Sequence, residues 1–386
     1  MIQKAARLGE VKEYYFSRKL REIATLRSEG KNIINIAIGS PDLAPPKAVV
    51  EEIKKAMVLP NVHQYQSYQG IPELRAAFCD FYKNNYNVSL NSNTEVLPLM
   101  GSKEGIMHIS MAFLNKGDKV LIPNPGYPTY ASVTKLVEAE AVLYNLNEAT
   151  NWLPNLEELE KEDLSKVKIM WVNYPHMPTG AVATKESFRE LIAFAKKHNI
   201  LIVNDNPYSF ILNENPTSIL EIEGAKEVAI ELNSLSKTFN MAGWRVGMVV
   251  GDAEIIKTIL QVKSNMDSGM FLGIQKGAVK ALKSSKFWFS DLNAIYTKRR
   301  KLVWEVFDAL NCTYDKSIGG LFVWAKLPKG NLAEDFTDKL LYQKDIFITP
   351  GTIFGTNGEG YIRASLCVST EVLNEVLNRL ETVKIK

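Results

Sequence analysis

The sequence is organised around a polar stretch at residues 234–247, which reads Ser234-Leu235-Ser236-Lys237-Thr238-Phe239-Asn240-Met241-Ala242-Gly243-Trp244-Arg245-Val246-Gly247. Apolar runs precede it at residues 228–232 and follow it at residues 246–250. A polar segment between two such runs is typical of a loop that joins two buried strands. Lys237 is therefore expected at a strand end, with hydroxyl groups just before it and Arg245 beyond it, an arrangement suited to holding a phosphate beside an amine.

Further apolar runs recur along the chain from residue 95 onward. They lie at Val96–Met100, Val120–Ile122, Ala141–Leu146, Lys168–Val172, Ile200–Val203, Val228–Leu232 and Val246–Val250. Helical stretches separate several of them, and buried strands joined by helices indicate an α/β fold with a mostly parallel seven-stranded sheet between helices. Such sheets bind ligands at the carboxyl ends of their strands, which is where Lys237 falls.

The pattern changes on both sides of this region. Residues 1–35 carry a helical pattern that ends at Gly30, and long charged helices and shorter strands follow residue 270. Strands are expected at 319–324 and 360–366. We therefore predict an N-terminal segment, residues 1–35, that packs with the small domain. A large domain would span residues 36–270 and a smaller α+β domain residues 271–386.

Composition narrows the classes of function. The 386 residues are 46% hydrophobic and 23% charged, which is ordinary for a soluble globular protein. A net charge of +3 and dispersed Lys and Arg residues favour small metabolites as partners over nucleic acid or a membrane surface. Three widely separated cysteines argue against disulfides or a metal site and for a reducing compartment. Because the sequence shows neither a membrane-length apolar run nor a signal-like N-terminus, we expect a cytoplasmic protein.

Other strand ends carry groups that suit one flat, phosphorylated ligand. Backbone N–H groups of Ser102 and Lys103 open a helix and could receive a phosphate, although a Gly-Ser pair is also a common cap. Tyr127, between two prolines, could lie against a ring or simply pack. Asp205 ends a strand, with Tyr208 after it, and could pair with a protonated pyridine nitrogen or cap a turn.

Two arginines complete this set, since a guanidinium matches a phosphate or a carboxylate bidentately. Arg245 and Arg363 would bind one phosphate and one substrate carboxylate. Each group alone has a plain structural explanation, but their combination in this order indicates a site where Lys237 forms an imine with pyridoxal 5'-phosphate.

These motifs resemble those of the fold type I, class I/II pyridoxal-phosphate aminotransferases, over nearly the whole chain. The pattern Ser-x-Ser-Lys-x-x-x-x-x-Gly-x-Arg-x-Gly carries the resemblance, and Lys237 matches its Schiff-base lysine. The branch most alike comprises aspartate, LL-diaminopimelate, alanine and methionine aminotransferases. The resemblance implies the pyridoxal-phosphate-dependent transferase fold and a homodimer with shared active sites.

The same resemblance implies a role for each site residue. The phosphate would be held by Ser234, Ser236, Arg245, Ser102 and Lys103, with Tyr65 reaching it from the neighbouring subunit. The ring would be held by Tyr127, Asp205 and Tyr208, and the substrate carboxylate by Gly39 and Arg363. The reaction would move an amino group from an L-amino acid to a 2-oxo acid by a ping-pong mechanism.

One position departs from the family pattern. Family members have Asn-Pro-Thr-Gly where this chain has Met177-Pro178-Thr179-Gly180, and a thioether cannot donate the hydrogen bond that the Asn gives to the cofactor's phenolic oxygen. The phenolic oxygen would then depend on Tyr208 and, if the loop is turned differently, on His176.

Other functions of the same fold stay open. A carbon–sulfur lyase would use the same lysine, and an aminotransferase-like ligand sensor would use the same fold without catalysis. Tyr14, Tyr15 and Phe16 are candidates to line the substrate pocket, but they also suit plain packing, and the sequence does not assign the substrate side chain.

Overall fold

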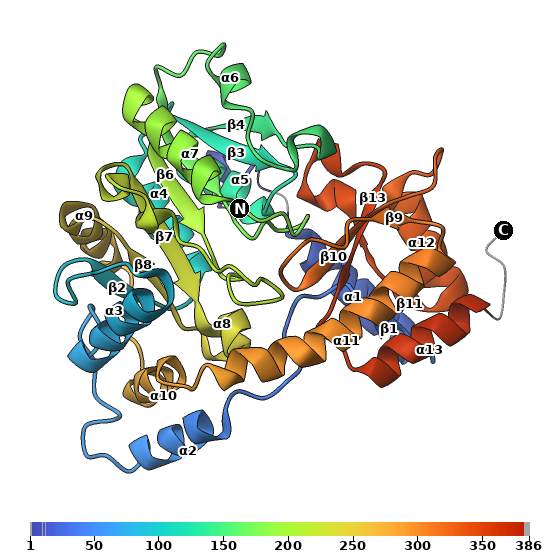
Figure 1. Ribbon diagram of the computed structural model, residues 1–386, viewed down its shortest axis with the longest axis horizontal. Coiled ribbons are helices and arrows are strands. Elements are labelled where there is room, and N and C mark those ends of the chain that lie inside the picture. The colour runs from blue at the N-terminus through green and yellow to red at the C-terminus, as the bar shows by residue number, and fades with distance from the viewer. Residues whose placement is uncertain (1, 10, 12, 382–386) are drawn as a thin grey trace.

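A computed structural model describes residues 2–9, 11 and 13–381, and it shows a large lobe and a smaller lobe (Figure 1). The large lobe is built on a seven-stranded sheet of order β2-β8-β7-β6-β5-β3-β4. Its strands are β2 (Val96–Leu99), β3 (Lys119–Asn124), β4 (Glu140–Asn145), β5 (Val167–Val172), β6 (Leu201–Asp205), β7 (Ala229–Ser234) and β8 (Gly247–Val250). Only β8 is antiparallel to its neighbours, β2 and β7. The predicted α/β class and the predicted strands are confirmed.

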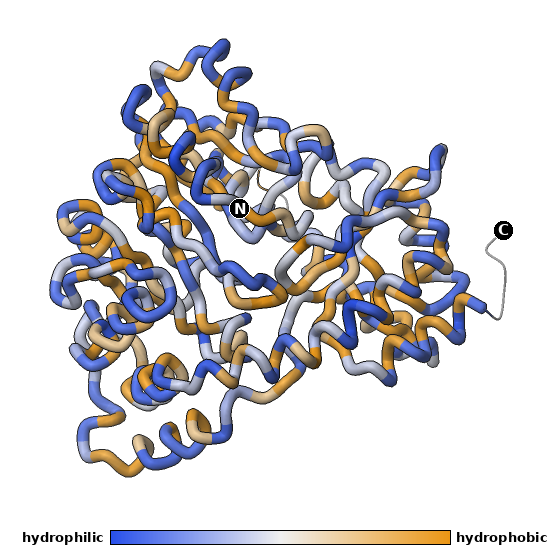
Figure 2. Tube along the Cα trace, viewed as in Figure 1, coloured by the Kyte–Doolittle hydropathy of each residue, from blue (hydrophilic) through white to orange (hydrophobic). Residues whose placement is uncertain are grey.

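Both faces of this sheet are buried, which explains why its strands are apolar throughout. Along β5, Ile169 and Trp171 belong to one hydrophobic cluster, whereas Met170 and Val172 belong to the other. Successive side chains of a strand point to opposite faces, so each face needs its own cover of helices. The hydropathy colouring in Figure 2 shows largely hydrophobic strands in the large sheet.

Helices supply that cover on each face. One cluster contains residues of α2 (Lys47–Ala56), α3 (Pro72–Tyr86), α7 (Lys185–His198) and α10 (Leu272–Leu282). The other contains residues of α4 (Ser102–Phe113), α5 (Pro128–Leu136) and α9 (Ala253–Lys263). The short helix α6 (Leu156–Leu159) precedes β5.

The small lobe has a four-stranded sheet of order β12-β13-β10-β9. Its elements are α11 (Phe287–Ala309), β9 (Thr313–Tyr314), β10 (Phe322–Lys326), α12 (Ala333–Lys344), β12 (Thr349–Pro350), β13 (Tyr361–Ser365) and α13 (Thr370–Glu381). The first of the two predicted strands begins only at residue 322, because the N–H groups of Gly319 and Gly320 donate to Gly180 and Ile211 in the large lobe. Helix α11 runs between the lobes (Figure 1).

The N-terminal segment lies against the small lobe. It contains α1 (Tyr15–Ser28) and β1 (Ile34–Asn35), and β1 pairs in parallel with β11 (Ile346–Phe347). Phe16, Ile23 and Ile33 pack against Leu341 and Phe347. The short 3-10 helices are η1 (Ala6–Leu8), η2 (Glu148–Thr150), η3 (Ile219–Glu221), η4 (Ala225–Glu227), η5 (Ala242–Trp244), η6 (Gly351–Phe354) and η7 (Thr356–Gly358).

Each helix of residues 2–9, 11 and 13–381 is too short or too polar to cross a membrane.

Candidate active site

A cavity of about 520 Å³ lies at the carboxyl ends of the strands of the large sheet. Parallel strands that end at one edge bring side chains from distant parts of the sequence together. The predicted site residues that line this cavity are Gly39, Ser102, Lys103, Tyr127, Asp205, Tyr208, Ser234, Ser236, Lys237, Arg245 and Arg363.

Lys237 stands on α8 (Leu235–Thr238), a single helical turn that follows β7 directly. The sequence predicted a loop here, but the Ser234 hydroxyl accepts a hydrogen bond from the Ser236 N–H at 3.1 Å and so caps a short helix. The Lys237 ammonium donates to the carbonyl oxygen of Gly39. Burial lowers the pKa of Lys237, and Arg363 and Arg245 lower it further, so this amine loses its proton more easily than an exposed lysine.

Hydroxyl groups, an arginine and a helix N-terminus form a cup beside Lys237. The Ser234 hydroxyl donates to Ser236 Oγ at 2.8 Å, and Arg245 Nη1 lies 3.5 Å from the same oxygen. Arg245 Nη2 would be only 2.1 Å from a Cβ at Gly101, so only glycine leaves room for the guanidinium. Ser102 begins α4, whose N-terminal N–H groups favour an anion. The cup therefore suits a phosphate.

Asp205 ends β6 at the base of the cavity. Its Oδ2 accepts a hydrogen bond from the Tyr130 hydroxyl at 2.9 Å, whereas its buried Oδ1 has no hydrogen-bond partner among the described residues. Burial raises the pKa of Asp205 to about 7, although the Tyr130 hydrogen bond acts in the opposite direction. A buried carboxylate with one open oxygen is suited to a protonated ring nitrogen.

Arg363 lies in β13, buried among aromatic rings. Its guanidinium carbon is 3.8 Å from the ring centroid of Phe322, 4.6 Å from that of Phe354 and 5.9 Å from that of Phe16. Nη2 donates to the Ala37 carbonyl at 2.9 Å, but no carboxylate pairs with this arginine among the residues that the structure describes. Burial lowers its pKa to about 10, so it is still a cation at neutral pH and requires an anion.

Met177 replaces the family's asparagine at the wall of the cavity. Arg363 Nη1 lies 3.2 Å from its sulfur, which is only a weak acceptor. His176 does not take over the missing donor role, because its Nδ1 is 2.8 Å from Thr179 Oγ1 and its side chain is not part of the cavity lining. The structure therefore leaves the position without an amide donor.

Tyr65 is the predicted site residue that the structure does not bring to this cavity. It is 91% exposed and lines a separate hollow with Gly269. Tyr14 and Phe16 line the main cavity, whereas Tyr15 does not.

Other lining residues were not predicted from the sequence, among them Tyr130, Asn173, Phe322 and Phe354. Asn173 donates to the Asp205 carbonyl and accepts from the Met177 N–H at 2.7 Å. Asn173 follows the apolar run of β5 directly. It could have been predicted from the sequence in the same way as Asp205, which is also a polar residue at a strand end. The two phenylalanines looked like ordinary core residues and gave no such signal.

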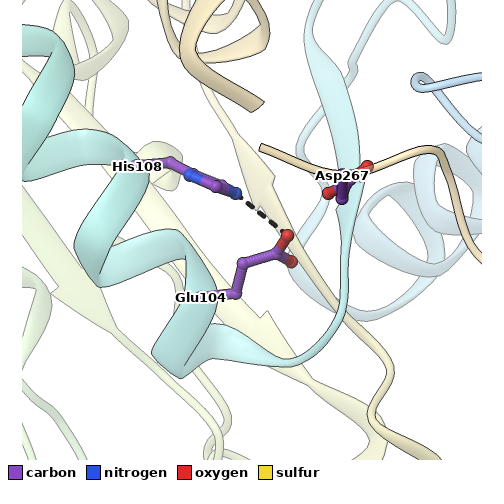
Figure 3. A group of neighbouring side chains, drawn as sticks. All are labelled: Glu104, His108 and Asp267. Atoms are coloured by element: carbon purple, nitrogen blue, oxygen red, sulfur yellow. Dashed lines mark hydrogen bonds and ion pairs between the residues drawn. The ribbon is translucent and has the colours of Figure 1, made fainter. Parts of the chain in front are cut away.

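A charged cluster lies between α4 and Asp267, which follows α9 (Figure 3). None of its three residues lines the cavity. Glu104 Oε1 and His108 Nε2 are 2.9 Å apart, and Asp267 lies opposite them. These three could hold a metal ion, but the buried ammonium of Lys263 already pairs with Asp267 and lies 3.7 Å from Glu104. The cluster therefore has its own cation and ties α4 to α9.

The residues at the cavity fit pyridoxal phosphate. The cup of hydroxyls, Arg245 and the α4 N-terminus could bind the phosphate. Asp205 Oδ1, which has no partner among the described residues, could accept a hydrogen bond from a ring nitrogen. Of the two lysines in the lining, Lys237 is the one that contacts the Gly39 carbonyl. An α/β fold with a lysine and an anion cup at one sheet edge suits an enzyme that uses a phosphorylated cofactor.

Known proteins share this architecture along the whole chain. The model of the family "Aminotransferase class I and II" matches residues 31–380. An LL-diaminopimelate aminotransferase of Dehalococcoides mccartyi is 42% identical over 98% of both chains. One from Aquifex aeolicus is 39% identical over 100% of both chains. The substrate-bound structure of BacF from Bacillus subtilis superposes with a TM-score of 0.95 at 35% identity, covering 99% of this chain and 98% of that one.

The chain belongs to the class I and II aminotransferases. Its activity is that of a pyridoxal-phosphate-dependent aminotransferase.

Proposed function

We propose that the enzyme moves an amino group from an L-amino acid to a 2-oxo acid by a ping-pong mechanism centred on Lys237. The observation that carries this proposal is a partly buried amine with a lowered pKa beside a phosphate cup, within one cavity that also holds Asp205 and Arg363. The bound cofactor supplies an electron sink for the substrate Cα.

Lys237 has two tasks in this proposal. Its amine would hold the cofactor, and once free of it the same amine would be placed to take a proton from the substrate Cα as general base and to return it as general acid. Its lowered pKa favours the neutral form that a general base requires. Asp205 keeps the ring nitrogen protonated through its open Oδ1, and Tyr130 orients the carboxylate from the other side.

Ser234, Ser236, Arg245, Ser102 and Lys103 hold the phosphate in this proposal. Tyr127 lies against the ring, and Tyr208 donates to its phenolic oxygen. These assignments rest on the shared cavity and on the family pattern.

The substrate carboxylate binds to Arg363 and to the backbone at Gly39. Arg363 is a buried cation without a carboxylate partner among the described residues, and Gly39 lies so close to Phe322 that a Cβ there would be 2.2 Å from the ring. An incoming carboxylate would therefore meet a guanidinium that lacks a counter-ion.

We also propose a cytoplasmic homodimer with shared active sites, in which Tyr65 of one subunit reaches the phosphate in the other. The exposure of Tyr65, far above that of the other tyrosines at the site, supports this. The domain division at residues 35 and 270 likewise stays a proposal.

The test is a panel of L-amino acids and 2-oxo acids, with the cofactor spectrum followed for each half-reaction. Transfer that requires both a donor and an acceptor supports the proposal. Release of pyruvate and ammonia from a donor without an acceptor would instead make the protein a lyase.

A further inference from the structure

The segment between β12 and β13, residues 351–358, contacts the large lobe at the edge of the cavity. It carries Phe354, which lines the cavity and packs on Arg363 with 4.6 Å between the guanidinium carbon and the ring centroid. The Gly126 N–H donates to the Phe354 carbonyl at 2.7 Å. Gly126 precedes Tyr127, another residue of the lining, so this hydrogen bond joins the two lobes beside the site.

Asparagine side chains complete this contact. Asn124, the last residue of β3, is 3% exposed. Its Nδ2 donates to Thr356 Oγ1 at 2.9 Å, and its Oδ1 accepts a hydrogen bond from the Asn357 N–H at 3.1 Å. Asn357 Nδ2 in turn donates to Asn145 Oδ1 at 3.0 Å and to the Asn124 carbonyl at 3.2 Å. An amide clamp, formed by Asn124, Asn145 and Asn357, thus ties the segment to the ends of the neighbouring strands β3 and β4.

Glycines allow the segment to pack this closely. Gly355 has a φ of +133°, and a Cβ there would lie 2.2 Å from Asn124 Oδ1. A Cβ at Gly351 would lie 2.1 Å from the Gly358 carbonyl oxygen, so the two ends of the segment are also in contact with each other. Because the segment is compact, we expect Phe354 to shift when the hold on Asn124 is lost.

The two phenylalanines that contact Arg363 most closely are held in different ways. Phe322 lies in β10, which pairs with β13, so the sheet fixes its position. Phe354 lies on η6 outside the sheet, on the segment that the amide clamp joins to the large lobe. Since packing of both rings restricts the rotamers of a long arginine side chain, the orientation of the guanidinium depends on the clamp.

We propose that Asn124 and Asn357 are positioning residues for substrate binding, which hold Phe354 against Arg363 and so orient the guanidinium toward the substrate carboxylate. This inference rests on the proposed function, in which Arg363 binds that carboxylate. Each contact of the clamp is made within one chain, so the inference does not depend on the proposed dimer. A carboxylate that is bound slightly out of place weakens binding without changing the reacting groups.

The first experiment compares Asn357→Ala with Asn331→Ala as a matched control. Asn331 is also a partly buried asparagine of the small lobe, but its side chain donates to the Pro328 carbonyl within that lobe. In the cofactor-loaded, full-length enzyme we measure kcat and KM for L-glutamate, L-alanine, L-phenylalanine and LL-diaminopimelate. For the donors that wild type uses, we expect Asn357→Ala to raise KM about tenfold with kcat within about threefold, and Asn331→Ala to change neither.

Two kinetic outcomes would overturn the positioning role. A lower kcat at unchanged KM would indicate a smaller folded fraction and thus a merely structural effect of the clamp. An unchanged KM combined with weaker binding of pyridoxal phosphate to the cofactor-free protein, measured by fluorescence titration, would show that the clamp acts on the cofactor and not on Arg363. Wild type that reacts with none of the donors would instead overturn the proposed function.

Hydrogen exchange tests the clamp without any turnover. The Gly126 N–H is bonded to the Phe354 carbonyl, so its exchange rate reports how firmly the segment is held. We expect exchange at Gly126 in cofactor-free protein to be about tenfold faster in Asn357→Ala than in wild type, and unchanged in Asn331→Ala. Equal rates in the two variants would overturn the clamp itself, whatever the donor panel shows.

Discussion

Two sets of ionisable residues in this molecule have the same chemistry and opposite surroundings. The edge groups Asp205, Lys237 and Arg363 line the cavity, and the interior groups Glu231, Lys263 and Arg299 lie elsewhere in the fold. Each edge group has an interior counterpart of its own charge and type.

The interior groups have full sets of partners. Glu231 accepts hydrogen bonds from Tyr82, Asn204 and the Ile219 N–H. Lys263 pairs with Asp267, and Arg299 pairs with Asp42 through both carboxylate oxygens at 2.6 and 2.8 Å.

The edge groups are incomplete by comparison. Among the described residues, Asp205 Oδ1 and Arg363 Nε have no hydrogen-bond partner, Arg363 has no carboxylate beside it, and Lys237 donates to a neutral carbonyl. Because leaving buried polar groups unpaired is costly, three incomplete charged groups around one cavity indicate a place where a ligand completes them. Mutation of an edge group should therefore lower activity, whereas mutation of an interior group should lower stability.

The lysines should show the largest contrast. Lys237→Ala removes the attachment point and the general base, so we expect turnover to fall by at least about 10⁴-fold and the absorbance band of the lysine-bound cofactor to disappear. Lys263→Met leaves Asp267 and Glu104 without their cation and should lower Tm, with turnover within about tenfold of wild type. Full activity of Lys237→Ala would contradict the proposed mechanism.

The carboxyl groups differ in how pH acts on them. The pKa of Asp205 is raised to about 7 in the folded protein, above the value of about 4 for an unfolded Asp. The folded state thus binds more protons between these values, and the contribution of Asp205 to stability falls as pH rises from 4 to 7. The variant Asp205→Asn has an amide that does not titrate, so it lacks this pH-dependent decrease in stability.

We therefore expect the Tm of cofactor-free Asp205→Asn, relative to that of wild type, to increase as pH rises from 4 to 7. Above pH 7 the Tm difference between the two proteins should stay constant. Turnover of the loaded variant should fall by about 10²-fold or more, because a neutral amide no longer holds the ring proton. Glu231→Gln should keep turnover within about threefold. A Tm difference for Asp205→Asn that is independent of pH would contradict the assigned pKa.

The arginines should show a moderate effect that separates binding from folding. Arg363→Gln removes the carboxylate-binding cation, so kcat/KM should fall by about 10²- to 10³-fold for every donor and acceptor, without loss of Tm. Arg299→Gln leaves Asp42 without its partner and should cost about 3 kcal/mol of unfolding free energy while substrate affinity changes little. A similar loss of Tm in both variants would show that Arg363 is mainly structural.

The sequence predicted the edge groups better than it predicted the side chains that surround them. Lys237, Asp205 and Ser102 were identifiable because the pattern of apolar strands places them at strand ends, a local property of the chain. The aromatic cage of Arg363 was not, since Phe322 and Phe354 look like core residues until the small lobe folds over the cavity. Hydrogen-bond completeness, which separates Arg363 from Arg299, depends on contacts between residues far apart in the sequence.

A substitution at Met177 should have the smallest effect of those considered, and it tests whether the edge groups lack a donor to the cofactor's phenolic oxygen. An asparagine there would donate a hydrogen bond to the cofactor's phenolic oxygen, and such a bond to a charged acceptor is worth about 1.5 kcal/mol. That corresponds to about one pKa unit, so Met177→Asn should lower the pKa of the imine nitrogen on Lys237 by about one unit in an absorbance titration. Met177→Leu, which has no donor, should titrate like wild type. If Met177→Asn also titrates like wild type, another group of this site already donates to the phenolic oxygen, and the edge would be more complete than its protein contacts indicate.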